Sequence, residues 1–384
     1  MTETTKYIYT SFLPEGKKLK VWVLAPYVET EDDNINYYYD FSQSIAEYTS
    51  VFKELNLEWV WQPISMKNHE DVINTILYEK NNSHFFPLVL NLCDGDEING
   101  TPGVSVVKKL EQSFLFYTGA DEFFYNITTS KIPMKKAFDD ARITTAPWTF
   151  FHNNNIDAEE TLAVVGKPII VKPAVSGGSM GVGVSNVVDN EDSLVSLVSN
   201  LFKGYRGWNL TVDGLIAEKY ISGPEYTTFI SGSYYNPEEA HIYTPVERVF
   251  HHSLPEKERF LSFDRLWEIY EDEKAMPENE NFYEYRTPPD ASIIEEIKKL
   301  SWRAFVATKG TGYTRVDIRM DEASKKLYVL ELNAQCGISE DENYTSIGAI
   351  LRLSGRTFTS LIVEILNDAI RRGLEKMKTN SLTF

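Results

Sequence analysis

The stretch that decides the fold is Thr314-Arg315-Val316-Asp317-Ile318-Arg319-Met320-Asp321, followed after a short break by Leu327-Tyr328-Val329-Leu330-Glu331-Leu332-Asn333. Apolar and polar residues alternate in both halves, which is the period of a β-strand, and the polar residues 321–326 between them predict a turn. The two halves are therefore predicted to form an antiparallel hairpin. One face of it is expected to be buried, with Val316, Ile318, Tyr328, Leu330 and Leu332.

The other face of the hairpin is expected to carry Arg315, Asp317, Glu331 and Asn333. Residues two apart on a strand point the same way, so the oxygen-bearing side chains of Asp317, Glu331 and Asn333 should meet at one place. Such a cluster suits Mg²⁺, a hard cation that takes a few carboxylates together with nucleotide phosphates. The alternative is a solvated strand face whose charges only favour solubility.

Length and charge limit the kinds of partner. The chain has 384 residues, which is long for one core and fits two or three domains. Its net charge of -18 disfavours nucleic acid or an anionic membrane surface as a partner. Cys93 and Cys336 lie far apart, which predicts no disulfide framework, and no segment resembles a signal peptide or a membrane span. We expect a soluble protein of the reducing cytoplasm.

The first third of the chain alternates strand and helix patterns. Strands are predicted near residues 20–26, 58–61 and 87–92, with amphipathic helices near 45–55 and 72–77. This alternation predicts a parallel sheet, where ligands sit beyond the carboxyl ends of the strands. The loop 93–100 leaves one such end, and Thr101 and Pro102 are expected to begin the next helix.

Two lysines and a glycine-rich loop suggest a phosphate site. Lys131 falls in the first turn of a predicted helix, where the helix dipole favours anions rather than cations. Lys172 ends the apolar strand 168–173, and the following loop contains Ser176, Gly177, Gly178 and Ser179. Glycines allow close backbone approach and offer N–H groups to anionic oxygens. The alternative for the loop is a flexible hairpin turn.

The remaining segments give a mixed pattern. Residues 215–221 and 225–230 are predicted strands joined by 222–224, and residues 237–289 read as a long, partly ordered excursion over the site. Asp290 is expected to cap a helix, and another helix is expected around residues 358–369.

Several of these segments together resemble the ATP-grasp ligases, specifically the D-alanine:D-alanine ligase family. The similarity lies in residues 166–173, in residues 217–225, and in Arg315-Val316-Asp317 with Glu331-Leu332-Asn333. It implies an α/β protein with three-domain ATP-grasp architecture. Residues 1–120 would form the N-terminal domain with the parallel sheet, 121–221 the central subdomain with the glycine-rich loop, and 222–384 the C-terminal subdomain with the metal site.

The resemblance also implies roles for individual residues. Lys131 and Lys172 match lysines on ATP phosphates, and the loop that closes over those phosphates matches Ser176, Gly177, Gly178 and Ser179. The adenine-binding strand matches Glu218, Lys219, Tyr220 and Ile221, and Glu225 matches the acid that binds ribose. The ligands of two Mg²⁺ ions, or Mn²⁺ in their place, match Asp317, Glu331 and Asn333. The donors around the tetrahedral intermediate match Arg315 and the N–H of Gly337.

The implied reaction is an ATP-dependent ligation. A carboxylate attacks the γ-phosphate to give an acyl phosphate, and an amine then opens it to an amide; charge neutralisation and alignment matter more here than covalent help from the protein. The partners would be a small carboxylate and a small amine, and a homodimer is left open. The alternatives are an ATP-grasp phosphotransferase and a nucleotide-binding protein without catalysis.

The sequence departs from the family pattern at both substrate positions. Residues 25–36 lack the glycine-rich loop that orients the first amino acid, and Arg265 and Trp267 stand near the place of a lysine–tyrosine pair. Where a serine should bind the second carboxylate, the chain reads Ser339-Glu340-Asp341-Glu342-Asn343. Three acids at 340–342 would repel a carboxylate, which predicts an amine substrate other than D-alanine, itself cationic. The alternative is that these acids face solvent.

Overall fold

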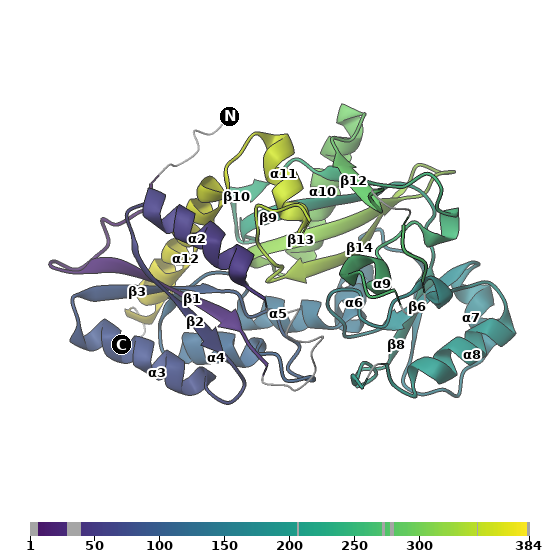
Figure 1. Cartoon of the computed structure of the whole chain (residues 1–384), viewed down its shortest axis with the longest axis horizontal. Coiled ribbons are helices and arrows are strands. Elements are labelled where there is room, and N and C mark those ends of the chain that lie inside the picture. The colour runs from purple at the N-terminus through teal and green to yellow at the C-terminus, as the bar shows by residue number, and fades with distance from the viewer. Residues whose placement is uncertain are drawn as a thin grey trace.

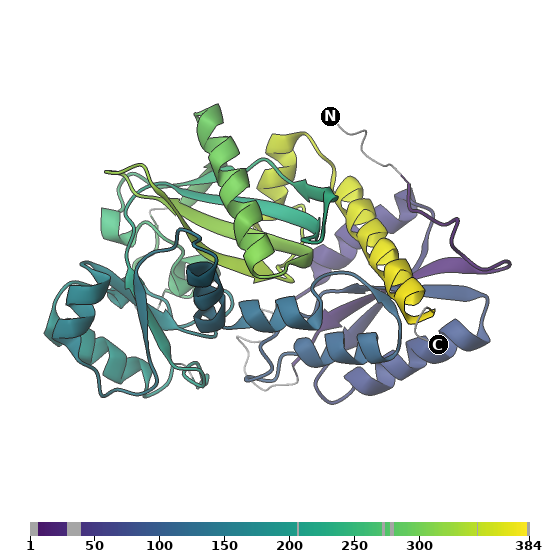
Figure 2. The same ribbon diagram turned by 180° about the vertical axis from the view of Figure 1, so that it is seen from behind.

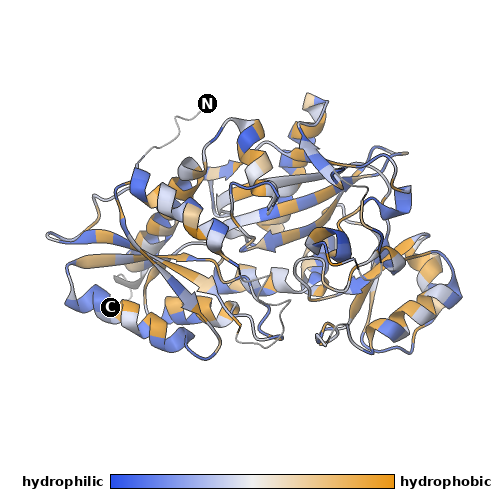
Figure 3. Cartoon of the chain, in the orientation of Figure 1, coloured by the Kyte–Doolittle hydropathy of each residue, from blue (hydrophilic) through white to orange (hydrophobic). Residues whose placement is uncertain are grey.

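The computed structural model describes residues 7–28, 40–205, 207–270, 273–276, 280–343 and 345–381. Three sheets with surrounding helices make up this part of the chain (Figure 1). Each sheet draws its strands from one of the three ranges given above, and the division into domains stays a proposal. Figure 3 shows hydrophobic residues along the strands and both kinds of residue on the helices around them.

The N-terminal sheet is parallel, as predicted, with strand order β2-β1-β3-β4. Its central strand β1 is buried on both faces, which explains its continuous apolar sequence. The strands are β1 (Lys18–Pro26), β2 (Glu58–Ile64), β3 (Phe85–Asn91) and β4 (Phe116–Tyr117), and the helices are α2 (Ser42–Glu54), α3 (His69–Asn82) and α4 (Val104–Gln112).

The start of α4 differs from the prediction. Gly103 occupies the N-cap position, so Thr101 and Pro102 precede the helix. Their carbonyls accept hydrogen bonds from the N–H groups of Glu97 and Gly95, at 3.1 and 2.9 Å, which closes the loop after β3 on itself. Backbone groups used in this way are not available to begin a helix.

The central sheet is antiparallel, with order β5-β8-β6-β7, and two helices pack on it. Its elements are β5 (Trp148–Phe151), α7 (Ala158–Val165), β6 (Ile169–Pro173), β7 (Val187–Val188), α8 (Glu191–Leu201) and β8 (Leu215–Lys219). The strand predicted next to β8 along the chain, β9 (Glu225–Ser233), lies in a different sheet. Residues 222–224 therefore connect two sheets rather than two neighbouring strands.

The largest sheet has the order β12-β11-β9-β13-β14, and β10 also pairs with β9. Three of its strands come from the range 237–289 that was predicted to be irregular: β10 (Asn236–Ile242), β11 (Val246–Phe250) and β12 (Tyr283–Arg286). That prediction was wrong for these strands because their charged and aromatic side chains hide the apolar–polar alternation of a strand. The short helix α9 (Phe263–Trp267) lies between them.

The antiparallel hairpin predicted over residues 314–333 is confirmed. Its strands are β13 (Thr311–Met320) and β14 (Leu327–Ala334). The prediction of its buried face is confirmed for Val316, Ile318 and Leu332 but was wrong for Tyr328 and Leu330, which are partly exposed. Asp317 pairs with Glu331, but Ile318 pairs with Val329, so Leu330 is one residue too many on its strand. This β-bulge shifts the alternation by one, and Val329 is fully buried where Tyr328 and Leu330 were expected.

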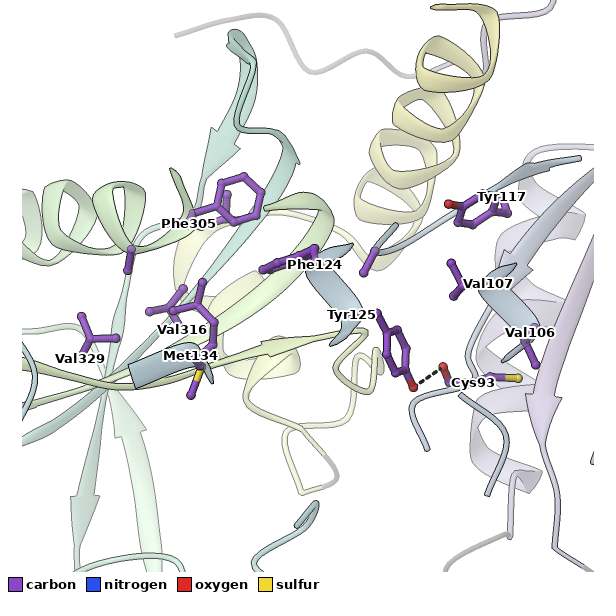
Figure 4. Close-up of a cluster of buried hydrophobic side chains, with 14 of the residues drawn as sticks. Cys93, Val106, Val107, Tyr117, Phe124, Tyr125, Met134, Phe305, Val316 and Val329 are labelled. Carbon is purple, nitrogen blue, oxygen red and sulfur yellow. Dashed lines mark hydrogen bonds between the residues drawn. The ribbon is translucent and has the colours of Figure 1, made fainter. Parts of the chain in front are cut away.

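One hydrophobic cluster joins the N-terminal and largest sheets. Figure 4 shows Phe305, Val316 and Met134 on one side and Val106 and Tyr117 on the other. Helix α5 (Glu122–Thr129), which the sequence analysis did not predict, carries Phe124 and Tyr125 between them. The remaining helices are α6 (Lys131–Asp140), α10 (Ala291–Ala307), α11 (Ser346–Ser354) and α12 (Phe358–Ser381).

The C-terminal helix α12 packs against both β4 and β9, so it covers parts of two sheets (Figure 2). The predicted cap of α10 is confirmed, because Asp290 accepts a hydrogen bond from the N–H of Ser292. Both cysteines are buried and free. None of the helices in the described part is long and apolar enough to cross a membrane.

Candidate active site

The polar face of the hairpin brings the predicted metal ligands together. Asp317 lies opposite Glu331, and Arg315 lies opposite Asn333, in the ladder between β13 and β14. The amide Nδ2 of Asn333 lies 3.0 Å from Asp317 Oδ2 and 3.3 Å from Glu331 Oε1. Arg315 Nη2 lies 3.0 Å from the same Asp317 oxygen. The alternative of a merely solvated face does not explain this convergence of partly buried groups.

This donor set fits Mg²⁺. No group of three His, Cys, Asp or Glu side chains among the described residues could hold a metal, so two carboxylates and the Asn333 amide make up the set here. Rotation of that amide by 180° would present its oxygen to a cation in place of its nitrogen. Two carboxylates and an amide oxygen leave positions for phosphate oxygens and water, as Mg²⁺ requires.

Lys131 lies in the first turn of a helix, as predicted, because it is the first residue of α6. Its side chain points toward the polar face of the hairpin. Its Nζ lies 3.4 Å from Glu331 Oε2 and 3.4 Å from the carbonyl of Ser176 in the glycine-rich loop. Burial by itself would raise the pKa of Glu331, but Lys131, Lys172 and Arg315 outweigh it and lower this pKa to about 2. Glu331 is therefore ionised and available to a cation at neutral pH.

Lys172 is the last residue but one of β6 and makes an ion pair with Glu218 Oε1. The second oxygen of Glu218 lies 2.7 Å from the Nζ of Lys135, a fully buried lysine that the sequence analysis did not single out. A signal was present, because Lys135 follows Lys131 by four residues and so lies on the same side of α6. The site thus holds three lysines where two were predicted.

The glycine-rich loop lies under a second segment, and Trp267 at the end of α9 covers it. The Trp267 indole Nε1 donates to the carbonyl of Gly178 at 2.8 Å. Gly178 has φ +53°, and a Cβ there would come within 2.9 Å of the Trp267 ring, so the contact requires glycine. Ser179 turns away, donating from Oγ to the carbonyl of Leu261 at 2.9 Å.

A cavity of about 250 Å³ lies between the glycine-rich loop and the N-terminal sheet. Its lining comes from the loop 94–101, from α5, from residues 175–178 and Met180, from Trp208 and Trp267, and from Asn333 and Ala334. It therefore reaches the carboxyl end of β3, where open parallel sheets bind ligands. Of the predicted residues, the described lining includes Ser176, Gly177, Gly178 and Asn333.

Asp94 gives the cavity an acidic wall. Its side chain is open to the space in the cavity, yet protein atoms surround it, and this desolvation raises its pKa to about 6. Asp96, also in the lining, adds to the increase. Asp96 itself accepts hydrogen bonds from the N–H groups of Ile98 and Asn99, which shape the loop.

None of the predicted nucleotide-strand residues Glu218, Lys219, Tyr220 and Ile221 is in the lining of this cavity, and two of their N–H groups are already engaged. The N–H of Tyr220 donates to the carbonyl of Pro168 at 2.9 Å, and the N–H of Lys219 donates to Pro147, also at 2.9 Å. Ile221 is buried.

Glu225, the predicted ribose ligand, does not line the cavity. It is buried in an ion pair with Arg248, and Arg319 Nη2 lies 3.5 Å from its Oε2. Neither arginine was recognised in the sequence.

The segment after β14 places its acids away from the cavity. Glu342 Oε2 lies 2.7 Å from Arg352 Nη2, and Asp341 accepts the N–H of Asn343 at 2.9 Å in a local turn. Glu340 is exposed, and Gly337 lies in the exposed part of the loop before it. The alternative interpretation of 340–342, that these acids face solvent, describes this arrangement.

Arg265 is likewise structural rather than part of the cavity. It is buried and paired with Glu258 at 2.6 Å and with Glu273 at 3.2 Å.

Comparisons with known proteins identify the family of the chain. The family model described as "D-ala D-ala ligase C-terminus" matches residues 137–367. A D-alanine–D-alanine ligase of Stutzerimonas stutzeri is 24% identical over 264 residues, covering 69% of this chain and 72% of that protein. One of Clostridium beijerinckii is 24% identical over 330 residues, covering 85% and 94%.

Solved structures show the same fold. The D-alanine–D-alanine ligase of Bacillus anthracis in complex with ATP superposes with a TM-score of 0.64 at 18% identity, covering 93% of this chain and 99% of that one. The enzyme of Coxiella burnetii gives 0.64 at 16% identity, covering 95% and 99%. Because the family model covers more than half of the chain, this protein belongs to the D-alanine–D-alanine ligase family of ATP-dependent carboxylate–amine ligases with the ATP-grasp fold.

Proposed function

We propose that this chain uses ATP to activate a small carboxylate as an acyl phosphate and joins it to a small amine, with a substrate pair other than two D-alanine molecules. The observation that carries the proposal is the meeting of Lys131, the hairpin acids and the glycine-rich loop. Lys131 contacts both Glu331 and Ser176 at 3.4 Å, so cation, metal ligand and loop share one place.

The roles of the residues follow from their charges. Lys131 and Lys172 would neutralise the phosphates of ATP, and the N–H groups at Gly177 and Gly178 would bind phosphate oxygens. Asp317, Glu331 and Asn333 would hold Mg²⁺, which when bound neutralises the charge of the transferring phosphoryl group. We propose that two ions bind, and that Mn²⁺ can take the place of Mg²⁺.

Arg315 and the N–H of Gly337 would stabilise the oxyanion that develops when the amine attacks the acyl phosphate. Arg315 is anchored for this by Asp317, with Nε 3.1 Å and Nη2 3.0 Å from Oδ2. A donor held in place before the reaction needs no reorganisation as charge develops. Glu218, Lys219, Tyr220 and Ile221 would border adenine, and Glu225 would reach ribose after release from its arginines.

The acidic wall of the cavity suits a substrate whose side chain carries a positive charge, which D-alanine lacks. Asp94 lies in the lining without a cation within salt-bridge distance among the described residues. A side-chain ammonium or guanidinium group of a substrate would complete such a wall, since a carboxylate without a cationic partner favours an opposite charge. We therefore propose a substrate whose cationic group lies beside Asp94 rather than beside residues 340–342.

The test is a measurement of ADP release with pairs of amino acids and related metabolites, together with mass detection of the condensed product. A ligase requires both a carboxylate and an amine for release. Release with an alcohol or phosphate acceptor would instead show a phosphotransferase, and ATP binding without release would show a nucleotide-binding protein. Preference for D-alanine as nucleophile would overturn the proposed difference in substrates.

Location and assembly are also proposed. We infer a reducing cytoplasm, which suits two cysteines that are buried and unpaired. Small-molecule substrates alone would then be the partners, and a homodimer is the state to test. Light scattering after size exclusion distinguishes a monomer of 44.0 kDa from a dimer.

A further inference from the structure

Lys135 is the buried charge that the mechanism above does not use. It lies one turn after Lys131 on α6, with a side chain that is 0% exposed. A lysine is almost never fully buried unless it is paired, because its charge loses hydration. Its partner Glu218, 2% exposed, also pairs with Lys172, so one buried carboxylate stands between two ammonium groups.

Lys135 also connects Glu218 with the strand that carries the metal ligands. Its Nζ donates to Thr145 Oγ1, which in turn donates to the carbonyl of Val329 at 2.9 Å. Thr145 and Val329 form an isolated β-bridge, and Val329 lies two residues before Glu331 on β14. The lysine is therefore held from the central sheet and from the largest sheet at once.

The arrangement sets up a competition for Lys172. In this structure Lys172 is bound to Glu218, whereas the proposed function requires it on the phosphates of ATP. If Lys172 were the sole partner of Glu218 and turned to the phosphates, Glu218 would remain buried and ionised without a positive charge beside it. Such an unpaired buried charge is strongly unfavourable. A second cation that stays on Glu218 removes this obstacle.

We propose that Lys135 is a positioning residue for ATP binding: it neutralises Glu218 and so frees Lys172 for the nucleotide phosphates. The inference rests on the proposed function, since it uses the assignment of Lys172 to phosphate. Lys135 itself touches neither ATP nor the reacting atoms in this scheme. It acts through Glu218, and its effect should disappear when Glu218 carries no charge.

The test measures equilibrium binding of a non-hydrolysable ATP analogue with Mg²⁺, by calorimetry, in a double-mutant cycle. Lys135→Met removes the charge and should weaken binding at least tenfold, while Lys135→Arg, which keeps the charge, should stay within threefold of the wild type. In a Glu218→Gln background the same Lys135→Met change should alter binding less than threefold. A purely structural role would give equal losses in both backgrounds.

Lys136→Met is the matched control. Lys136 is the next residue on α6, exposed, with its Nζ 5.3 Å from the centre of the Phe150 ring. Its replacement removes the same charge from the surface and should leave binding unchanged. In steady-state assays Lys135→Met should raise the KM for ATP much more than it lowers kcat, because its role is completed once Lys172 has reached the phosphates.

The results separate this inference from the proposed function. If the wild type does not bind the analogue, or Lys172→Met binds it normally, the assignment of the site fails. If the wild type binds and Lys135→Met binds equally well, or the loss is equal in both backgrounds, only the role of Lys135 is overturned. Should Lys135→Met fail to fold, Lys135→Met with Glu218→Gln decides: binding equal to Glu218→Gln alone supports the inference, and weaker binding overturns it.

Discussion

Asp317 shows how much chemistry depends on one side chain. Asp317 accepts hydrogen bonds from Arg315 and Asn333 and lies opposite Glu331, so it connects the proposed metal ligands with the proposed oxyanion donor. Removal of its charge would affect both. Two predictions from the sequence also depend on Asp317: the metal site and the resemblance to the family.

Asp317→Asn should lower kcat/KM by at least roughly 100-fold, since even indirect partners of metal ligands cost up to about that much. Titration of ADP release with Mg²⁺ should show half-maximal activity moved to higher concentration. Asp321→Asn is the control: Asp321, just after the same strand, accepts the Ser324 N–H at 2.7 Å in the turn, which asparagine can also do. Equal Mg²⁺ curves for Asp317→Asn and wild type would argue against the metal site.

Glu218 makes a prediction about pH. Burial would raise its pKa, but Lys135 and Lys172 outweigh burial and lower it from the ordinary value of 4.5 to about 2. A carboxyl whose pKa is lower in the folded state stabilises the fold above pH 4.5, and this stabilisation is lost as the pH falls toward 2. The contribution is on the order of 3 kcal/mol.

Urea unfolding at several pH values checks this. The free energy of unfolding of the wild type should fall more steeply between pH 4.5 and 2 than that of Glu218→Gln, which has no carboxyl to protonate at this position. Parallel pH curves for the two proteins would contradict the pairing of Glu218 with both lysines.

At the scale of elements, the bulge in β14 determines which residues of the hairpin are buried. Leu330 is the extra residue, so Leu327 and Val329 before it and Leu332 after it are all buried, although a regular alternation cannot place all three on one face. The bulge keeps Glu331 opposite Asp317. Bulges often direct side chains near active sites in this way.

The bulge predicts unequal effects of two neighbouring truncations. Val329→Ala should destabilise the protein by roughly 2 kcal/mol, because Val329 is fully buried and two methyl groups are removed. Leu330→Ala should cost less, since Leu330 is partly exposed, although it removes more atoms. Thermal or urea unfolding measures both, and a larger loss at Leu330 would restore the simple alternation predicted from sequence.

The glycine-rich loop and α9 are distant in sequence but in direct contact in the structure. The loop contacts α9 through Trp267, and Ser179 donates to Leu261 just before that helix, so segments more than 80 residues apart in sequence are joined by direct hydrogen bonds. The sequence predicts that residues 237–289 lie over the site, but it does not indicate which of them contacts the glycine-rich loop. Trp267 became a site residue only through this contact.

At the scale of the molecule, Gln335 connects β14, which carries two of the proposed metal ligands, with the N-terminal sheet. It follows β14, is buried, donates from Nε2 to the carbonyl of Asn91 at the end of β3, and accepts the N–H of Ala120 at 3.0 Å. These bonds fix the cavity between the two sheets, since Asn333 and the loop after β3 are both in its lining.

Gln335→Ala should destabilise the protein by roughly 2 kcal/mol, because the Ala120 N–H loses its partner and Asn91 keeps only the longer bond from Tyr313, at 3.4 Å. Gln112→Ala, at an exposed position on α4, is the control and should change stability little. Unfolding in urea compares the two. If Gln335→Ala is as stable as Gln112→Ala, Gln335 does not hold the two sheets together.

The sequence by itself determined the elements with a clear period and the residues whose chemistry is local. The parallel N-terminal sheet, the hairpin, Lys131 at a helix start and the cluster of Asp317, Glu331 and Asn333 all follow from spacing along one or two segments. Only the tertiary structure decided the bulge at Leu330, the burial of Lys135 against Glu218 and the pairing of Glu225 with arginines. The physical reason is that the free energy of a buried charge, or of an extra residue in a ladder, depends on partners from distant segments, which no local pattern records.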